Sequence, residues 1–187
     1  MTGVQTCALP IFYLLSKNPG ARERLEAEVD AALGKRVPKY EDLKSLPFAM
    51  QVLKESMRLF PPAYIVGRRA TRPVDLLGLR VDRNDIVLVN VAGLHRRPEI
   101  FADPDRFDPD RFTAEREKAL PRYAYLPFGA GPRVCIGNHF ALMEGQILLA
   151  TYAQHVRLDL EDPRDVGVEP LVTLRPKGHL RARVTPR

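Results

Sequence analysis

Residues 128–137, with the sequence FGAGPRVCIG, constrain the fold of this chain more than any other segment. They place one thiol, Cys135, directly before a run typical of a helix, which we expect over about 139–154. A free thiol titrates at about 8.5, and the N–H groups at a helix N-terminus favour its anion. The loop is therefore expected to present a sulfur anion to an electrophile, such as a metal. Its glycines suit positive φ angles and close backbone approach: Gly129, Gly131 and Gly137.

The composition is that of a single globular domain. The chain has 187 residues, of which 45% are hydrophobic and 28% charged, which is enough to bury a core. Seventeen prolines indicate that long connections separate short elements. The two cysteines do not suggest a disulfide framework and fit a reducing, cytoplasmic location. No apolar run approaches the roughly 20 residues that span a membrane, so no membrane segment is expected in this chain.

The net charge of +6 favours acidic partners. The 23 acidic residues are interspersed among the basic ones, however, and basic stripes with interleaved aromatic residues are absent. Nucleic-acid binding is therefore not expected.

Residues 1–11, MTGVQTCALPI, differ in character from the rest of the chain. They match the in-frame translation of a widely used sequencing adapter. We therefore expect this segment to be an artefact and residues 12–187 to be the biological portion. The nucleotide sequence would test this, because codons unlike the adapter leave an ordinary N-terminus as the explanation. Cys7 accordingly carries no functional weight.

Apolar periodicity and turn residues predict helices, short strands and long connections. One helix is expected from Asn18-Pro19, a capping side chain followed by proline at the first helical position, to Gly34. Residues 96–127, rich in Pro, Asp, Arg and aromatics, are expected to form an ordered meander. The other expected elements are a short helix or turn over 40–46, a helix over 48–59, strands over 74–81 and 86–92 with a polar turn at 82–85, and closing strands near 172–174 and 180–184.

Glu55 and Arg58 lie three residues apart in the helix expected over 48–59, so they share a face. Alone, such a pair would be an exposed ion pair of little energetic weight. Arg111, in PDRF, offers a second guanidinium, and Arg106, in a near-copy of that segment, competes for the same role. A buried carboxylate between two guanidiniums would fasten the meander to the helix.

Three segments together resemble the C-terminal part of the cytochrome P-450 (haem-thiolate monooxygenase) family. The loop at 128–137 matches that family's haem-binding signature, F-x-x-G-x-R-x-C-x-G, at every fixed position. KESMRLFPP at 54–62 matches its E-x-x-R helix and proline-rich exit. FDPDRF at 107–112 matches its P-E-R-F element, with Asp110 in place of Glu. The three occur in the family's order and approximate spacing, and the resemblance covers the chain from Phe12 to its end.

The resemblance implies a fold that is mainly α with small β-sheets (α+β), of which this chain would be a C-terminal fragment. It implies haem b as cofactor, with Cys135 as the axial iron ligand, in place of the small buried hydrophobe that a lone cysteine usually is. Phe128 would pack over the ligand loop, and residues 63–67 would line the substrate pocket. Four side chains are implied as partners of the haem propionates or as neighbours of the haem edge: Arg133, Arg68, His95 and Arg96. For His95 a structural or surface role is the alternative, and the remaining histidines, His139, His155 and His179, have no supporting context.

By the same resemblance, the activity would be insertion of one oxygen atom from O₂ into an apolar organic substrate, a fatty acid or similar lipid being one candidate. A separate ferredoxin, flavodoxin or reductase would deliver the electrons, and an acidic donor would suit the excess of Lys and Arg. A second reading keeps the haem site but uses peroxide, as a peroxygenase or peroxide isomerase does. A third is an inert fragment, because the family's oxygen-activating helix would lie upstream of FYLLSKNP and is expected to be missing, together with any N-terminal anchor.

Overall fold

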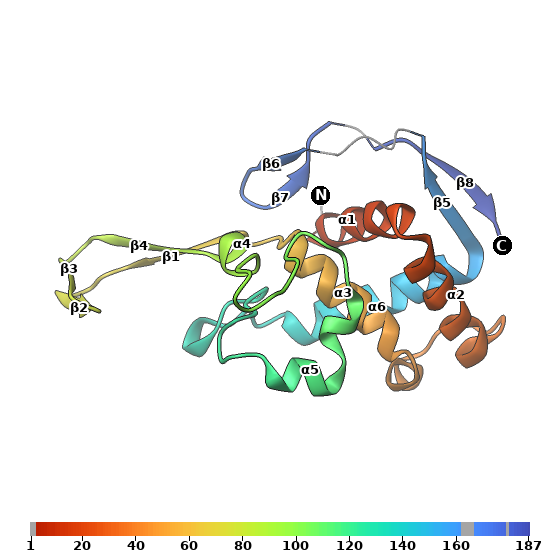
Figure 1. Ribbon diagram of the computed structural model, residues 1–187, viewed down its shortest axis with the longest axis horizontal. Helices are drawn as coiled ribbons and strands as arrows, with labels where there is room; N and C mark the ends of the chain where they lie inside the picture. The colour runs from red at the N-terminus through yellow and green to blue at the C-terminus, as the bar shows by residue number, and fades with distance from the viewer. Residues whose placement is uncertain (1–2, 162–166, 179) are drawn as a thin grey trace.

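Four helices form the body of the protein, which we describe from a computed structural model covering residues 3–161, 167–178 and 180–187. They are α1 (Gly3–Lys17), α2 (Pro19–Leu33), α3 (Pro47–Leu59) and α6 (Asn138–His155). Figure 1 shows them packed against one another, with a long two-stranded arm projecting from one end and two pairs of strands lying beside α1. The expected class, mainly α with small β-sheets, is confirmed, as are the helices expected over 48–59 and about 139–154.

The core lies where these four helices meet. Leu25, Val29 and Leu33 recur at helical spacing along α2 and bury one face, as the sequence predicts. They pack in one cluster with Ile11 and Leu15 of α1, Val52 and Leu53 of α3, and Leu149 and Ala150 of α6. At the crossing of α3 and α6, a Cβ on Gly145 would lie 3.0 Å from Leu53 Cδ2. Because Gly145 has no Cβ, the two helices approach closely. This contact positions α3, which carries charged residues of the candidate site.

The boundary between α1 and α2 differs in one detail from the prediction. Pro19 occupies the first turn of α2, as expected, but the Asn18 side chain does not cap that helix. Its Nδ2 instead donates to Leu14 O at 2.8 Å and so satisfies a terminal carbonyl of α1. At the other end, Gly34 takes φ +57° and stops α2. The short helix expected near 40–46 is a 3₁₀ turn, η1 (Tyr40–Ser45).

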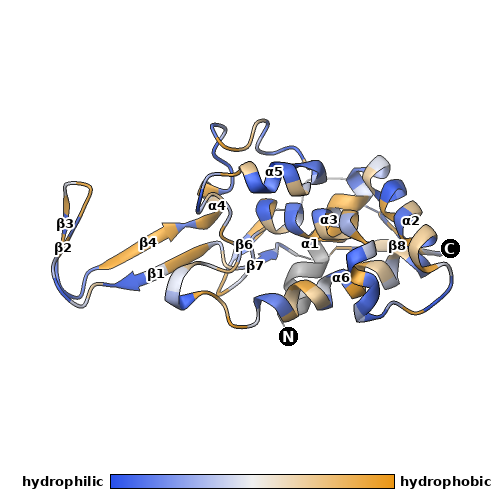
Figure 2. Cartoon of the chain, turned by 90° about the horizontal axis from the view of Figure 1, so that it is seen from below, coloured by the Kyte–Doolittle hydropathy of each residue, from blue (hydrophilic) through white to orange (hydrophobic). Residues whose placement is uncertain are grey.

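The projecting arm consists of two antiparallel pairs, β1 (Ile65–Arg69) with β4 (Ile86–Asn90) and β2 (Val74–Leu76) with β3 (Leu79–Val81). The prediction of one strand over 74–81 was wrong, because Leu77 and Gly78 take φ +55° and +85° and fold it into a tight hairpin. Strand β1 was not predicted, since its Gly-Arg-Arg sequence lacks apolar alternation. Figure 2 shows the apolar colouring of β4, whose Ile86 and Leu88 side chains are exposed.

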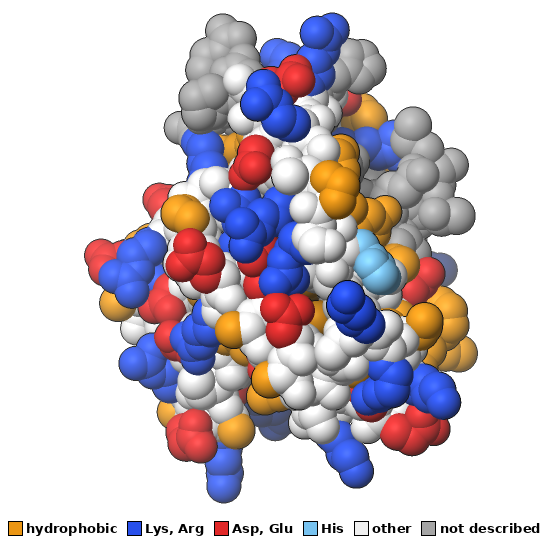
Figure 3. All heavy atoms as spheres, turned by 90° about the vertical axis from the view of Figure 1, so that its right-hand side faces the viewer, with side chains coloured by type: hydrophobic (Ala, Val, Ile, Leu, Met, Phe, Trp, Pro, Cys, Tyr) orange, Lys and Arg blue, Asp and Glu red, His pale blue; other side chains and the backbone are white. Residues whose placement is uncertain are grey.

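Two further antiparallel strand pairs follow α6. Strand β5 (Val156–Leu160) pairs with β8 (Ala182–Pro186), and β6 (Val168–Pro170) pairs with β7 (Leu174–Pro176). The closing strands expected near 172–174 and 180–184 thus lie a few residues later, and β5 and β6 were missed. His179 lies outside the described residues. Ion pairs fasten this region to α2, among them Arg157–Glu26 at 2.6 Å and Arg187–Asp30 at 2.7 Å. Basic and acidic side chains are interspersed over the end of the molecule that carries α2 and the C-terminus (Figure 3).

Two short helical turns order the meander: η2 (Pro109–Phe112) and α5 (Ala114–Ala119). Helix α4 (Val91–Leu94) precedes it, and η3 (Gly131–Arg133) lies inside the cysteine loop. Helix α5 was not predicted; the Thr113 hydroxyl at its N-terminus accepts a hydrogen bond from Arg116 N at 3.4 Å. Segment η2 packs against α3 and thereby brings PDRF to the E-x-x-R helix. In the described part of the chain, every helix is too short or too polar to cross a bilayer.

Candidate functional site

Glu55 and Arg58 form a buried ion pair where α3 packs against the meander. Both side chains are 0% exposed. Arg58 Nε donates to Glu55 Oε2 at 2.7 Å and Arg58 Nη2 to Oε1 at 2.8 Å, the parallel two-bond geometry that suits a guanidinium and a carboxylate. The exposed surface pair considered from the sequence is therefore excluded. Burial raises the pKa of the Glu55 carboxyl, and the hydrogen bonds and charge of Arg58 act against that rise.

Arg58 also binds the backbone of the meander. Its Nη1 donates to His95 O at 2.9 Å and to Pro104 O at 2.7 Å, and its Nη2 donates to Arg106 O at 3.2 Å. With the two bonds to Glu55, these occupy the five N–H groups of the guanidinium. A segment with little regular secondary structure is thus held through its carbonyl groups by one buried cation. The sequence offers no signal for these carbonyl acceptors.

Of the two candidate third members, Arg111 lies beside the carboxylate. Its Nε is 3.5 Å from Glu55 Oε1, an ion-pair distance without a hydrogen bond, and its Nη2 donates to Asp103 O at 3.0 Å. Arg106 contributes its backbone carbonyl instead, while its guanidinium pairs with Asp108 at 3.0 Å. We call Glu55, Arg58 and Arg111 the charged cluster. Asp108 N completes it by donating to Glu55 Oε1 at 2.9 Å.

The cysteine loop, residues 128–137, presents its thiol at the start of α6. Cys135 is exposed and free, unlike the small buried hydrophobe considered as an alternative. Gly129 and Gly131 take φ +72° and +69°, which allows the chain to turn back so that Cys135 N donates to Phe128 O at 2.9 Å. Gly137 differs from the expectation: it is the N-cap of α6, with φ −88°. A Cβ there would lie 3.9 Å from Cys135 Sγ, so its absence keeps space beside the sulfur.

A cavity of about 210 Å³ opens beside this loop. Gly129 and Ala130 of the loop line one side, and the strands of the arm line the other with one cation, Arg68. The remaining lining is aliphatic: Val66, Val89, Val91 and Leu126. Val134, Ile136 and Phe140, close to Cys135 in the sequence, have exposed apolar side chains. Arg133 is exposed in η3.

The chemical character of these residues matches that of a haem group. Haem presents an apolar ring with anionic propionates and accepts a cysteine thiolate as an axial iron ligand. The loop supplies one accessible thiol with apolar neighbours, and the cavity supplies aliphatic walls and an arginine beside glycine backbone. The predicted residues Gly129 and Arg68 are thus brought together around one cavity.

His95 and Arg96 do not line this cavity, and the expectation that they lie at the haem edge stays a prediction. His95 is 0% exposed, and its Nε2 accepts a hydrogen bond from Leu126 N at 2.8 Å. Arg96 donates to Leu59 O at 2.6 Å, at the C-terminal end of α3, and pairs with Asp105 at 3.2 Å. Both side chains already have partners within the protein, because the turn after α4 directs them toward α3 and the segment before the loop.

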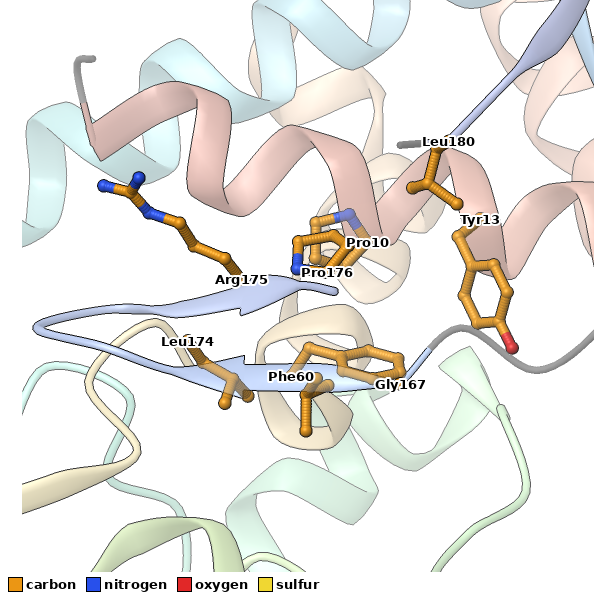
Figure 4. A pocket seen from close by; sticks show the side chains of 9 residues that line it. Pro10, Tyr13, Phe60, Gly167, Leu174, Arg175, Pro176 and Leu180 are labelled. Atoms are coloured by element: carbon orange, nitrogen blue, oxygen red, sulfur yellow. The ribbon is translucent and has the colours of Figure 1, made fainter. Parts of the chain in front are cut away.

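A second hollow, of about 20 Å³, lies between α1 and the hairpin β6–β7. Figure 4 shows its apolar lining, with Tyr13, Phe60 and Leu174 around it. Its size suits a water molecule and is too small for an organic substrate. The residues 63–67, expected to line a substrate pocket, do not border it; Val66 borders the cavity beside the cysteine loop instead.

Comparison with known proteins gives the same picture over most of the chain. The profile of the family described as Cytochrome P450 matches residues 2–180. Cyclooctatin synthase of Streptomyces melanosporofaciens is 41% identical over 161 residues, which cover 84% of this chain and 35% of the relative. Pentalenene oxygenase of Streptomyces avermitilis is 37% identical over 177 residues, covering 95% of this chain and 39% of the relative. The crystal structure of the cytochrome P450DA heme domain superposes with a TM-score of 0.91 at 30% identity, covering 98% of this chain and 41% of that one.

The chain spans about a third of the length of the curated relatives that it matches. The family profile and the fold similarity give the same assignment. The chain belongs to the cytochrome P450 family.

Proposed function

We propose that this chain forms the thiolate side of a haem monooxygenase site, with Cys135 as the axial ligand of haem b. The observation that carries the proposal is the exposed Cys135 thiol at the start of α6, in a loop turned by two glycines of positive φ. Bound haem would supply activation of O₂ for insertion of one oxygen atom into a substrate.

The protein's part in this chemistry is to hold a thiolate and an anionic ring in place. Cys135 lies just before the N-terminus of α6, and the absence of a side chain at Gly137 leaves room for donors to approach the sulfur. Arg68 in the cavity, and Arg133 in the loop, would neutralise the haem propionates. Phe128 is half-buried and packs against the four-helix core, so it anchors the start of the loop.

The substrate would be an apolar organic molecule. Related chains are named for oxidations of this kind, including pentalenene oxygenase, and the cavity beside the loop has aliphatic walls. A separate acidic electron donor, a ferredoxin, flavodoxin or reductase, would complement the net charge of +6. A cytoplasmic location suits a protein that depends on a free thiol.

We also infer that residues 12–187 are the biological portion and that 1–11 derive from an adapter. Helix α1 runs through this junction from Gly3 to Lys17, so the support comes from the adapter match in the sequence alone. Codons in an independent genomic read across this junction would test the inference, and codons that differ from the adapter would overturn it.

A second candidate concerns the isolated chain: an inert fragment. It is favoured by the exposed apolar side chains of Ile136, Phe140 and Leu88, which in a complete site would be covered. A peroxide-using enzyme with the same haem site remains the alternative within the family. Electron-donor dependence would separate it from the monooxygenase in a longer form of the protein.

Titration of the purified chain with haem, followed by reduction and addition of CO, tests the proposal. We expect the red-shifted Soret band of thiolate-ligated ferrous haem, and its loss in Cys135→Ser. Cys7→Ser is the matched control, because it removes the chain's other thiol and should leave the band unchanged. A band that persists in Cys135→Ser would refute the ligand assignment. Absence of haem uptake in the unmodified chain would favour the inert fragment.

A further inference from the structure

His95 is a buried titratable side chain that the proposed chemistry does not use. It follows α4, in which the Asn90 side chain accepts from Gly93 N at 2.9 Å and His95 N donates to Val91 O at 2.9 Å. These bonds fix the direction in which the imidazole leaves the backbone. The ring lies 5.1 Å from that of Tyr125 and is closed off from solvent.

The imidazole contacts the segment that leads into the cysteine loop. Its Nε2 accepts from Leu126 N at 2.8 Å, a bond between residues 31 positions apart. Tyr125, next to it, donates its hydroxyl to Lys54 O of α3 at 2.9 Å and packs on Phe112 at 4.7 Å. The segment before the loop is therefore held against α3 on one side and against His95 on the other.

The backbone carbonyl of His95 contacts the charged cluster. Its carbonyl accepts from Arg58 Nη1 at 2.9 Å, while its ring accepts from Leu126. Beyond that point, Gly129 N donates to Leu126 O at 3.1 Å and Cys135 N donates to Phe128 O at 2.9 Å. A chain of short polar contacts thus runs from a buried arginine, through one histidine, to the backbone of the thiol.

We infer that His95 is a positioning residue that fastens the start of the cysteine loop to the buried arginine of α3. Its Nε2 acts as an acceptor for a backbone N–H that would otherwise be half-buried without a partner. The consequence for haem ligation rests on the proposed function. The effect of His95 on the conformation of the loop is independent of the proposed function, because every contact involved lies within the protein.

This role requires the neutral imidazole, since a protonated ring has no acceptor. Burial lowers the pKa of His95 to about 4. The charges of Arg58 and Arg96 also lower this pKa, whereas backbone groups of Arg58 and Met57 raise it. The ring therefore stays neutral at physiological pH. Because Nε2 accepts, the proton belongs on Nδ1.

Amide hydrogen exchange, resolved by NMR, tests the inference without haem. His95→Phe keeps a ring of similar size but removes the acceptor, and His95→Gln keeps an acceptor at similar reach. We expect exchange at Leu126, Gly129 and Cys135 to rise about tenfold or more in His95→Phe and to return toward the original rate in His95→Gln. His155→Phe is the matched control, because the same change is made at an exposed histidine. Unchanged exchange at Leu126 in His95→Phe would overturn the inference.

A measurement on the unsubstituted chain covers the case in which His95→Phe fails to fold. Long-range ¹H–¹⁵N spectra at pH 7 should show the His95 imidazole neutral, with its proton on Nδ1 and Nε2 accepting. A proton on Nε2 would overturn the inference. In haem-loaded protein, His95→Phe should also lower the fraction with the thiolate-ligated CO spectrum. Failure of haem uptake in the unsubstituted chain would count against the proposed function alone, since exchange at Leu126 is read without haem.

Discussion

Replacement of Glu55 by alanine would leave the buried Arg58 guanidinium without its counter-ion. The side chain would lose two charge-assisted hydrogen bonds, of 2.7 and 2.8 Å, and keep only three backbone carbonyls as acceptors. Asp108 N would lose its acceptor as well. Breaking one side of a buried ion pair costs about 3–5 kcal/mol, because the remaining charge stays desolvated.

That cost is a large part of the total stability of an ordinary domain, about 5–15 kcal/mol. With a urea m-value of about 2 kcal/mol/M, the unfolding midpoint of Glu55→Ala should fall by about 2 M. The meander should open first, since Arg58 holds its carbonyl groups. In a haem titration, we expect the variant to retain little or no haem.

Asp42→Ala is a closely matched control. Asp42 also accepts two bonds from one arginine, Arg36, at 2.9 Å each, and one from a backbone N–H, Lys39 N at 2.9 Å. The difference is solvent exposure of the arginine, which screens the charge that remains. Urea unfolding followed by circular dichroism would compare the two variants. Equal shifts in midpoint would refute the argument that burial makes the Glu55–Arg58 pair consequential.

Three further predictions concern the charged cluster, the loop and pH. Arg111→Leu should lower the melting temperature more than Arg106→Leu, because Arg111 lies beside Glu55; equal shifts in thermal unfolding would contradict this. Gly129→Ala should cost about 1 kcal/mol or more at φ +72°, whereas Gly137→Ala, at φ −88°, should cost less in urea unfolding of the haem-free chain. Because folding lowers the pKa of His95 from 6.5 to about 4, its stabilising contribution should be complete above pH 6.5 and be lost progressively toward pH 4, by up to about 3 kcal/mol. His95→Gln should flatten that slope in urea midpoints measured against pH, and an unchanged slope would assign the acid sensitivity to other groups.

Short-range features of this protein follow from the sequence. Helices α2, α3 and α6 are predicted because apolar residues recur at helical spacing and because proline and glycine mark their ends. The positive φ angles at Gly129 and Gly131 belong to a loop whose glycines are adjacent to the thiol in the chain. Each of these features depends on residues within a few positions of one another, where backbone sterics decide the conformation.

Features that join distant segments depend on the tertiary structure. Strand β1 forms because β4 pairs with it, although its own sequence has little strand character. The choice of Arg111 over its near-copy Arg106 depends on how η2 packs against α3. The hydrogen bond from Leu126 N to His95 Nε2 joins residues 31 positions apart, and no local pattern predicts it.

The sequence by itself determined the family, through the three motifs and the spacing between them, and the position of the thiol ahead of a helix. Only the tertiary structure decided what the buried charges bind. The acceptors of Arg58 are backbone carbonyls of His95, Pro104 and Arg106, and every residue carries such a carbonyl. Packing of the meander against α3 selects these three, because burial leaves a guanidinium no water and stabilises the arrangement that pairs all its N–H groups.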